Sequence, residues 1–331
     1  MDNLIDFVIL WVDSSDKVWL EQKKKFYNGE LNQDKINVYR DWDNLKYWFR
    51  GVEKYTPWVN KIHFVTFGHL PKWLNINNPK LHIVKHEDFI PKVFLPTFSA
   101  NSIELFINRI EGLNEKFVYF NDDTFIIKDM KEKDFFVNNL PCDSALLSTT
   151  IPSVKNEIFT YILFNDLLYV NANFNKKLSL KNNLFKWINF KYGKNILKNI
   201  YLLPIGKFCG FTNLHLPNSY LKSTFDEVWY KEREILFNTV RNKFRTKNDV
   251  NQYIFKYWQL ASGKFFPRSP FIGKCFVIGE DRENIRDAFF NSKYKMICLN
   301  DSTSYIDFEL EKELINSYFE KLLPEKSSFE K

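Results

Sequence analysis

Apolar and polar positions follow two different periods in the first part of the chain. Leu4–Val12 is a continuous apolar run of the length that buried strands favour, whereas Asp43–Lys54 carries apolar residues at helical spacing. Strands alternating with helices predict an α/β fold with a mainly parallel, Rossmann-like sheet. The further predicted elements are strands at Lys61–Phe67, Lys80–Val84 and Lys116–Phe120, and a helix at Asn101–Ile110 that ends before Gly112.

Helical patterns dominate the second half, which we expect to pack on the sheet. A short apolar run at Met296–Leu299 predicts one returning strand, and the closing PEKSSFEK is typical of a frayed tail. The chain thus divides into an α/β core at 1–150, a mainly helical part at 151–323 that completes the functional site, and a tail at 324–331. The predicted helices are Tyr161–Val170, Leu184–Lys191, Tyr220–Asn238, Asp249–Ala261 and Asp307–Leu323.

Composition narrows the class of protein but does not choose its partner. With 45% hydrophobic and 26% charged residues among 331, the chain has the balance of a globular protein with a sizeable core. The formal charge of +7 suits an anionic partner such as a nucleotide, a phosphorylated glycan or a membrane surface. Lysines and arginines are interleaved with acids rather than gathered in a stripe, which argues against nucleic-acid binding.

Cysteine spacing and the N-terminal residues indicate a reducing compartment. The cysteines lie far apart and form no CxxC pair, which argues against a zinc knuckle or a disulfide scaffold. The first residues lack a basic region, and the apolar run Phe7–Val12 is too short for a signal peptide or a membrane span. We therefore expect a cytoplasmic protein. The cysteines are Cys142, Cys209, Cys275 and Cys298.

An acidic pair marks the end of the strand in KFVYFNDDTFIIKDM, residues 116–130. Asp122 and Asp123 follow this strand, and Asp13 follows the first strand of the chain. Ligands bind beyond the carboxyl ends of the strands in such sheets, so the three carboxylates are candidates for one site. Their hard oxygens suit Mg²⁺ or Mn²⁺. The ordinary alternative is a solvated turn with an Asx cap.

Other polar residues each have a structural and a functional interpretation. His215, in NLHLPNSYLKS, is either a packed histidine or a catalyst. Arg245 is either a solvated arginine or a phosphate ligand, since its guanidinium fork matches two phosphate oxygens. Glu104 and Asn108 share a helix face beside Arg109, where an ordinary wet face is the alternative to a binding surface. No phosphate-binding glycine motif is present, so spacing alone indicates an α/β nucleotide-binding enzyme and leaves its metal dependence open.

Four blocks of the chain, in order, resemble the conserved blocks of a known family. The first is IDFVILWVDSSDKVW, the second runs from Tyr39 to Asp123, the third contains LHLPNSYLK and FRTKNDVNQYIFKYWQL, and the fourth is KMICLND. The second block includes VEKYTPWV, LPTFSANSIE and RIEGLNEKFVYFNDD. Together they resemble the Stealth family of sugar-1-phosphate transferases, which includes bacterial capsule polymerases. The resemblance covers about half of the chain and implies a nucleotide-sugar-transferase-like sheet.

The resemblance implies an activity and a set of site residues. Such enzymes transfer a sugar-1-phosphate from a nucleotide sugar to a hydroxyl of a glycan acceptor, forming a phosphodiester and releasing a nucleoside monophosphate. His215 matches the candidate general base, and Arg245 matches an arginine that holds phosphate. The other implied residues are Asp123 in catalysis, Asp13, Arg40, Glu104, Arg109, Asn121 and Asn300 in substrate binding, and Asp122, Asp123 and Asp301 as ligands of Mg²⁺ or Mn²⁺.

This chain also departs from the family pattern. In IELFINRI, Phe106 and Asn108 stand where the family usually has two histidines, and Phe67, Lys46 and Trp48 replace other usual residues. These changes bear on donor identity more than on reaction type. Two alternatives stay open: a conventional metal-dependent glycosyltransferase that releases a nucleoside diphosphate, and a non-catalytic glycan-binding subunit. A role in capsule synthesis further implies contact with a membrane-bound polysaccharide-assembly complex at the inner face of the membrane.

Overall fold

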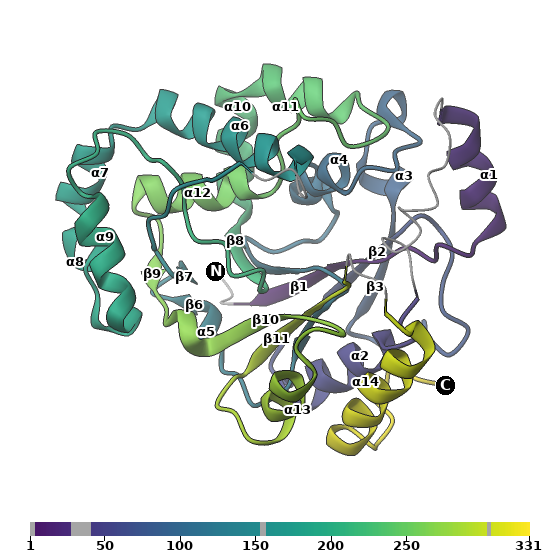
Figure 1. Ribbon diagram of the computed structural model, residues 1–331. Coiled ribbons are helices and arrows are strands. Elements are labelled where there is room, and N and C mark those ends of the chain that lie inside the picture. Colours follow the sequence, from purple (N-terminus) through teal and green to yellow (C-terminus); the bar gives the residue numbers. More distant parts are fainter. Residues whose placement is uncertain (1–3, 28–40, 153–156, 303–305) are drawn as a thin grey trace.

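The fold is built on a five-stranded sheet in the order β3-β2-β1-β4-β8 (Figure 1). The computed structural model describes residues 4–27, 41–152, 157–302 and 306–331. Four strands of the sheet are parallel, and β8 is antiparallel to β4. The α/β fold with a mainly parallel sheet is therefore confirmed. The strands are β1 (Ile5–Leu10), β2 (Ile62–Thr66), β3 (Leu81–Lys85), β4 (Lys116–Phe120) and β8 (Asn218–Leu221).

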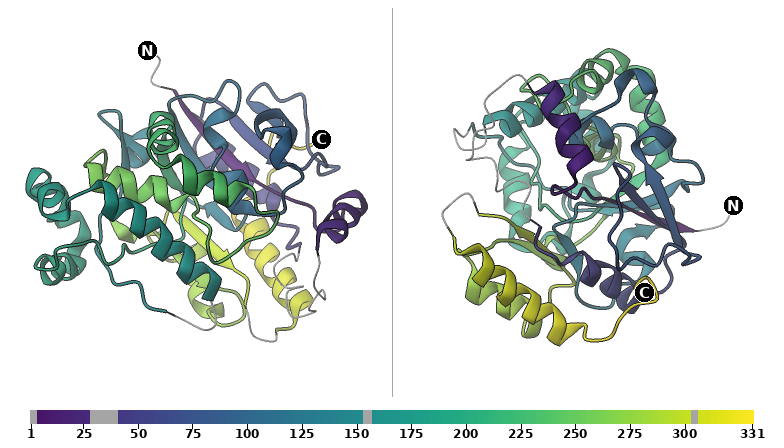
Figure 2. Two further views of the ribbon diagram at one scale, coloured as in Figure 1. Left: turned by 90° about the horizontal axis from the view of Figure 1, so that it is seen from above. Right: turned by 90° about the vertical axis from the view of Figure 1, so that its right-hand side faces the viewer.

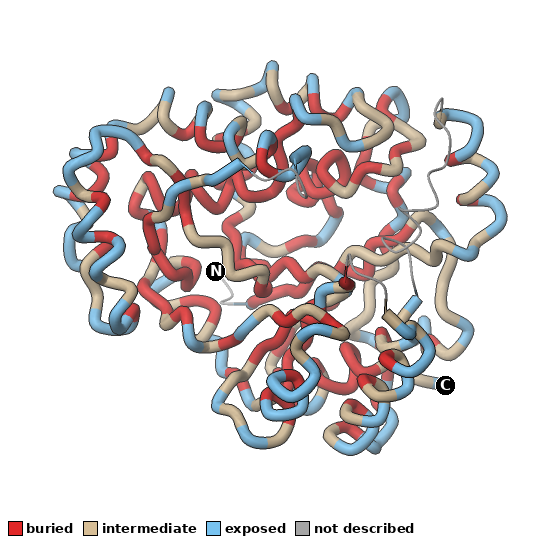
Figure 3. Tube along the Cα trace, in the orientation of Figure 1, coloured by how far each residue is buried: buried red, intermediate tan, exposed pale blue. Residues whose placement is uncertain are grey.

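The central strands are apolar runs because both faces of the sheet are covered. Successive side chains of a strand point to opposite faces. Phe7 and Ile9 of β1 accordingly enter one core cluster, and Val8 enters another. Helices α2 (Leu45–Tyr55), α13 (Arg282–Phe290) and α14 (Phe308–Leu322) lie on the first face, and α4, α6, α10, α11 and α12 lie on the second (Figures 1 and 2). The buried strands run through the middle of the molecule (Figure 3).

Two smaller sheets complete the strand pattern. β5 (Thr124–Ile126) pairs antiparallel with β11 (Met296–Asn300), which pairs in parallel with β10 (Gly273–Val277). The third sheet joins β6 (Phe136–Val137), β7 (Leu140–Asp143) and β9 (Phe266–Pro267). Strands from beyond residue 150 thus pair with strands from before it in all three sheets, because β8, β11 and β9 come from the second half.

The second half is largely helical, as expected, but the helix predicted at Leu184–Lys191 ends at Trp187, and the strands β9 and β10 were not predicted. The pattern also fails near residue 220. There the single helix expected at Tyr220–Asn238 is wrong, because the chain forms β8 and then two helices that break at Glu232. No helix in the described part of the chain is long and apolar enough to cross a bilayer. The helices of this half are α6 (Glu157–Asn173), α7 (Lys176–Asn182), α8 (Leu184–Trp187), α9 (Ile196–Leu202), α10 (Lys222–Lys231), α11 (Arg233–Val240) and α12 (Tyr253–Ser262).

Several short elements in the first half escaped the pattern. α1 (Lys17–Phe26) begins at Asp16, whose carboxylate accepts the Trp19 amide as an N-cap. The helix expected at Asn101–Ile110 is two pieces, α4 (Ala100–Glu104) and a 3-10 turn at Ile107–Arg109, and Gly112 follows with a positive φ of 73°. The remaining short helices are α3 (His86–Phe89), α5 (Glu132–Phe135) and 3-10 turns at Lys92–Phe94, Phe190–Asn195 and Pro270–Ile272.

The C-terminal residues are anchored, so the expectation of a frayed tail at 324–331 is wrong. Arg50 donates from Nε and Nη2 to the two carboxylate oxygens of Glu330, at 2.8 and 2.9 Å, and from Nη1 to the Leu323 carbonyl. Phe329 is only 2% exposed and packs on Phe49, with ring centroids 5.2 Å apart. A polar composition suggested disorder, but a two-pronged ion pair and one aromatic side chain hold the segment.

Replacement of Phe329 by alanine tests this anchor. We expect the free energy of unfolding to fall by about 3 kcal/mol, because a fully packed phenylalanine leaves both lost contacts and a cavity. Phe190→Ala is the matched control, since the Phe190 ring is 98% exposed. Urea unfolding of both variants measures the difference. Equal stability of Phe329→Ala and the unmodified chain would show that the tail is not docked in solution.

Candidate active site

The acidic pair lies where the chain passes from the main sheet to the second sheet. Asp122 and Asp123 occupy the turn between β4 and β5. Thr124 closes this turn, since its amide and hydroxyl both donate to the Asn121 carbonyl, at 3.1 and 2.7 Å. Asp13 follows the neighbouring parallel strand β1, whose Ile9 pairs with Phe120. The carboxylates therefore share one edge of the sheet, as the strand pattern predicted.

His215 reaches this turn from the loop that precedes β8. Its Nε2 lies 3.5 Å from Asp123 Oδ2 and 3.2 Å from Asn121 Nδ2. An amide nitrogen only donates, so Nε2 accepts this hydrogen bond in neutral His215 and the ring proton then sits on Nδ1. His215 also has a φ of 50°, a region that non-glycine residues rarely adopt. This backbone turn and the two contacts present a basic nitrogen beside the acidic pair.

The fourth block meets the second across an antiparallel strand pair. Cys298 of β11 pairs with Thr124 of β5, and the Leu299 amide donates to the Asp123 carbonyl at 2.8 Å. Asn300 is exposed and Asp301 half-buried at the end of β11. Blocks almost 180 residues apart in sequence thus converge on one turn.

Crowding and like charge favour the protonated forms of the two carboxyls. The Asp122 side chain reaches solvent, but protein atoms surround it closely. The pKa of Asp122 is raised to about 7, mainly by desolvation and to a smaller extent by the charge of Asp123. Desolvation also raises the pKa of Asp123, and a positive charge on His215 opposes this rise. Asp123 Oδ1 is buried and accepts no hydrogen bond from the described residues. A divalent cation would supply the missing partner and the missing charge, so these oxygens fit Mg²⁺ or Mn²⁺.

Asp13 is positioned by a histidine that the sequence did not single out. The Asp13 amide donates to Nε2 of His69 at 2.7 Å, and Asp13 Oδ1 accepts from the Ser15 amide and hydroxyl. Burial lowers the pKa of His69, although Asp16 and Asp13 oppose the change. The signal was its place in FGHLP, directly after β2, because that strand ends at the same edge. His69 therefore supports the Asp13 loop as a neutral ring.

Of the two arginines predicted to contact the donor, the structure describes Arg245 but not Arg40. Arg245 is exposed in the loop before α12 and forms no ion pair with the described residues, which leaves its guanidinium available to an anion. Its charge acts on Glu104, so it lies near the helix α4. Arg40 falls outside the described residues. Its neighbour Asp41 is close enough to raise the pKa of Asp122 further, so the chain approaches the site at that point.

Glu104 has a structural environment rather than the expected substrate contact. It is 6% exposed and accepts from the Tyr119 hydroxyl at 2.9 Å and the Gln252 amide at 3.3 Å. Burial raises its pKa, and the charge of Arg245 opposes this. Both of its oxygens already have donors, so the assignment of Glu104 to substrate binding is corrected to a buried link between β4 and the start of α12.

Neighbouring residues of this second-block segment also contact other side chains of the protein. Arg109 lies over the rings of Phe106 and Trp229, with its guanidinium 4.9 and 5.6 Å from their centroids, and no hydrogen bond or ion pair in the described chain joins it to the acidic pair. Phe106 is fully buried, and Asn108 donates to Asp226 at 2.7 Å. The assignment of Arg109 to the substrate is therefore not supported by the geometry, and the residues in place of the two family histidines serve packing.

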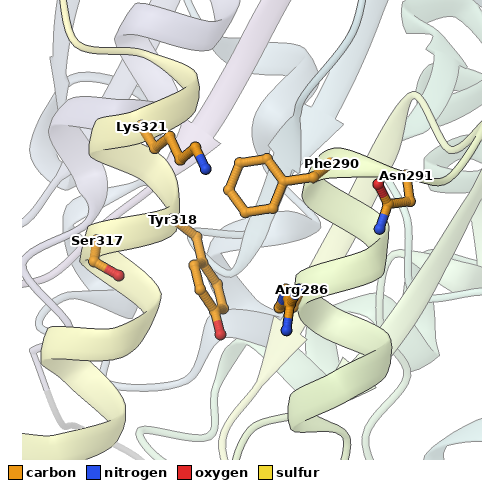
Figure 4. Close-up of a pocket in the computed structure, with 6 residues that line it drawn as sticks. All are labelled: Arg286, Phe290, Asn291, Ser317, Tyr318 and Lys321. Atoms are coloured by element: carbon orange, nitrogen blue, oxygen red, sulfur yellow. The ribbon is translucent and has the colours of Figure 1, made fainter.

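A separate surface hollow lies between α13 and α14 (Figure 4). Two cationic side chains, Arg286 and Lys321, line it together with Tyr318 and Phe290. Its described lining contains no carboxylate and no histidine, so it offers neither a cation ligand nor a base. The chemistry that the sequence predicted is at the β4–β5 turn instead.

The raised pKa of Asp122 makes stability depend on pH. Folding disfavours its charged form, so the penalty is absent at low pH and grows as pH rises from the ordinary 3.8 toward about 7. We expect Asp122→Asn to unfold at a higher temperature than the unmodified chain at about pH 8 without metal, and at the same temperature at about pH 4. Exposed Asp129, changed to asparagine, is the control. A gain that is equal at both pH values would contradict the shift.

Comparisons with known proteins support the second block and the family. Residues 38–144 match the family model described as Stealth protein CR2, conserved region 2. The chain is 49% identical over 330 residues to a capsular polysaccharide phosphotransferase, WcwK, of Streptococcus pneumoniae, covering 99% of this chain and 98% of that protein. It is 41% identical over 329 residues to an exopolysaccharide phosphotransferase, cps2G, of Lactiplantibacillus plantarum, covering 99% and 96%.

A third relative and one solved structure complete the comparison. A receptor polysaccharide phosphotransferase, WefC, of Streptococcus gordonii is 40% identical over 98% of both chains. A solved galactosyltransferase, LgtC, in complex with donor and acceptor sugar analogues aligns over 94% of this chain and 95% of that one. Its identity of 9% and TM-score of 0.39 are too low to establish a shared fold. The full-length relatives and the matched region agree, and this chain belongs to the Stealth family of polysaccharide phosphotransferases.

Proposed function

We propose that this protein transfers a sugar-1-phosphate from a nucleotide sugar to a hydroxyl of a glycan acceptor, in the synthesis of a capsular or other cell-surface polysaccharide. Its full-length relatives are named polysaccharide phosphotransferases, which supports transfer of a phosphate-linked sugar. The observation that carries the proposal is the contact of His215 Nε2 with Asn121 and Asp123 at the end of β4. This places one basic nitrogen beside a pair of carboxylates at the ligand-binding edge of a parallel sheet.

The reaction needs a base where the acceptor hydroxyl meets the phosphorus. The acceptor oxygen forms a bond to the β-phosphorus, and the bond from that phosphorus to the bridging oxygen breaks. The acceptor proton moves to Nε2 of His215, and the nucleoside monophosphate leaves with the bridging oxygen. Asn121 keeps Nε2 unprotonated before the reaction, and Asp123 stabilises the imidazolium afterwards.

Charge neutralisation supplies much of the rate in phosphoryl transfer. Asp122, Asp123 and Asp301 would hold Mg²⁺ or Mn²⁺, which when bound neutralises the pyrophosphate. Exposed Arg245 would supply a guanidinium fork for the phosphoryl oxygens. Asn300, which ends β11, and Asp13, which follows β1, would contact the donor.

Released nucleotides identify the reaction. We incubate the protein with Mg²⁺, UDP-, CDP- and GDP-sugars and a mixed glycan acceptor, and expect a nucleoside monophosphate that forms only with acceptor. His215→Ala should turn over about 10²–10⁴ times more slowly while still binding donor. Asp122→Ala should lose metal-dependent turnover. Release of a nucleoside diphosphate would instead mean a glycosyltransferase, and tight donor binding without any release would mean a binding subunit.

Arg245 has a matched control within the same experiment. Arg241 lies four residues earlier in the chain, and its side chain is also exposed. Arg245→Ala should weaken donor binding and turnover, since a charged hydrogen bond to phosphate is lost, whereas Arg241→Ala should behave as the unmodified enzyme. Equal kinetics for the two variants would remove Arg245 from the site.

We further propose that helices α7, α8 and α9 rest on the inner face of an anionic membrane. These helices project from one side of the molecule (Figures 1 and 2). From residue 167 to residue 225 the chain carries nine lysines and no acidic residue. Phe185, Phe190 and Tyr201 in this projection are 85%, 98% and 82% exposed. Exposed aromatic rings among lysines are the chemistry of interfacial binding to anionic lipid.

Sedimentation with vesicles tests this surface. The unmodified protein should bind phosphatidylglycerol-containing vesicles, less so at high salt, and only weakly bind phosphatidylcholine vesicles. Phe185→Ser, Phe190→Ser and Tyr201→Ser together should weaken binding at least about tenfold, because three apolar insertions are lost. Tyr230→Ser is the control, since Tyr230 is 87% exposed on α10. Unchanged binding of the triple variant would exclude these helices.

A further inference from the structure

Two free thiols face the acidic pair from the second sheet. Cys275 of β10 and Cys298 of β11 are direct partners in a parallel register, so their side chains lie on the same face. The Cys275 thiol donates to Cys298 Sγ at 3.2 Å. The sequence gave no sign of this pair, because the two cysteines are 23 positions apart and belong to no CxxC motif.

The thiols meet two groups already described. The Cys298 thiol lies 3.5 Å from Asp123 Oδ2, and this oxygen is also 3.5 Å from His215 Nε2. The ligand atoms of His215, Cys275 and Cys298 all lie within 4.8 Å of one another. One nitrogen, two sulfurs and one oxygen thus lie close to one another. They come from four segments, namely the β4–β5 turn, the loop before β8, β10 and β11.

These separations match the edges of a tetrahedral zinc site. Zn²⁺ binds sulfur at about 2.3 Å and nitrogen or oxygen at about 2.0–2.2 Å, so neighbouring ligand atoms lie about 3.3–3.8 Å apart. The Cys298–Asp123 and His215–Asp123 contacts, both at 3.5 Å, fall within this range, and the sulfur–sulfur distance of 3.2 Å lies just below it. Asp123 Oδ1, which accepts no hydrogen bond in the described chain, leaves that carboxylate free to turn toward a cation.

We propose that Asp123, His215, Cys275 and Cys298 form a binding site for a thiophilic divalent cation, of which Zn²⁺ is the type, and that its occupancy inhibits the enzyme. Thiolate and imidazole ligands select Zn²⁺ over Mg²⁺, whereas carboxylates at Asp122 and Asp301 suit Mg²⁺. Inhibition follows because the cation takes the lone pair of His215 Nε2 and one carboxylate of the acidic pair. This second part rests on the proposed function, whereas the binding site does not.

Binding is measured first, without any substrate. The full-length, reduced, metal-free protein is titrated with Co²⁺, which gives a thiolate charge-transfer band and strong visible bands when four-coordinate. We expect both, at one Co²⁺ per chain, and displacement of Co²⁺ by Zn²⁺. Cys275→Ser should lose the charge-transfer intensity of one thiolate and weaken Zn²⁺ binding at least about tenfold, as should Cys298→Ser.

The other two cysteines provide matched controls. Cys142 and Cys209 lie outside the cluster. The Cys142 thiol donates to the Lys133 carbonyl, and the Cys209 thiol donates to the Lys207 carbonyl. Cys142→Ser and Cys209→Ser should keep the full Co²⁺ spectrum. Absence of a charge-transfer band, or a band that survives in Cys275→Ser and Cys298→Ser, would overturn the site. Circular dichroism of each variant verifies that a lost band is not lost folding.

Inhibition is measured separately, so that the two proposals fail in different ways. With Mg²⁺ present, Zn²⁺ should stop transfer by the unmodified enzyme at concentrations where Co²⁺ binding saturates, and Cys275→Ser should need at least about tenfold more Zn²⁺. Cys275 touches neither proposed substrate nor Mg²⁺, so this variant should turn over normally without Zn²⁺. Equal Zn²⁺ sensitivity of the two would overturn the inhibition. A spectrum as expected with no transfer under any condition would instead overturn the proposed function alone.

Discussion

The pairing of β11 with β5 is the constraint on which the site depends. β4 ends in the main sheet and β5 begins in another, so the three residues between them, 121–123, would be a free turn if β5 were unpaired. The Leu299 amide holds the Asp123 carbonyl, and Thr124 faces Cys298 across the ladder. Backbone hydrogen bonds from a distant part of the chain therefore fix the carboxylates, and the order of the strands brings the fourth block to the second.

The pairing of β11 with β5 holds two carboxyl groups, Asp122 and Asp123, close together, and this closeness changes their pKa values. Two adjacent carboxyls in a crowded turn have raised pKa values, Asp122 to about 7, because each loses hydration and Asp122 also meets the charge of its neighbour. The negative charge of these carboxylates can be neutralised by a protonated His215 or by a bound cation. The same crowding brings the thiols of Cys275 and Cys298 within reach of Asp123. The Asp123 carboxylate thus belongs both to the proposed Mg²⁺ ligands and to the proposed Zn²⁺ ligands. Whether His215 can act as a base then depends on which cation is bound.

The sequence predicted the central strands and the acidic turn because both are local. β1, β2 and β4 are apolar runs buried on two faces, and polar residues mark their carboxyl ends. What the sequence did not predict is long-range. His69 and the cysteine pair acquire their roles only when strands pair, and Phe329 docks only through Arg50 and Glu330. The sequence predicted that Glu104 and Arg109 lie at a polar helix face that contacts the substrate. In the structure Glu104 is buried in the core, and Arg109 lies over aromatic rings.

Sugar-1-phosphate transfer requires that the bond between the β-phosphorus and the bridging oxygen breaks, on the side of that phosphorus away from the sugar. An isotopically heavy oxygen placed between the sugar C1 and the β-phosphorus of the donor follows that bond directly. The product of an acceptor-dependent turnover is then weighed by mass spectrometry. Sugar-1-phosphate transfer to the hydroxyl predicts the label in the glycan phosphodiester and none in the nucleotide. Label in the released nucleotide would contradict the account, because the sugar–oxygen bond would then have been the one to break.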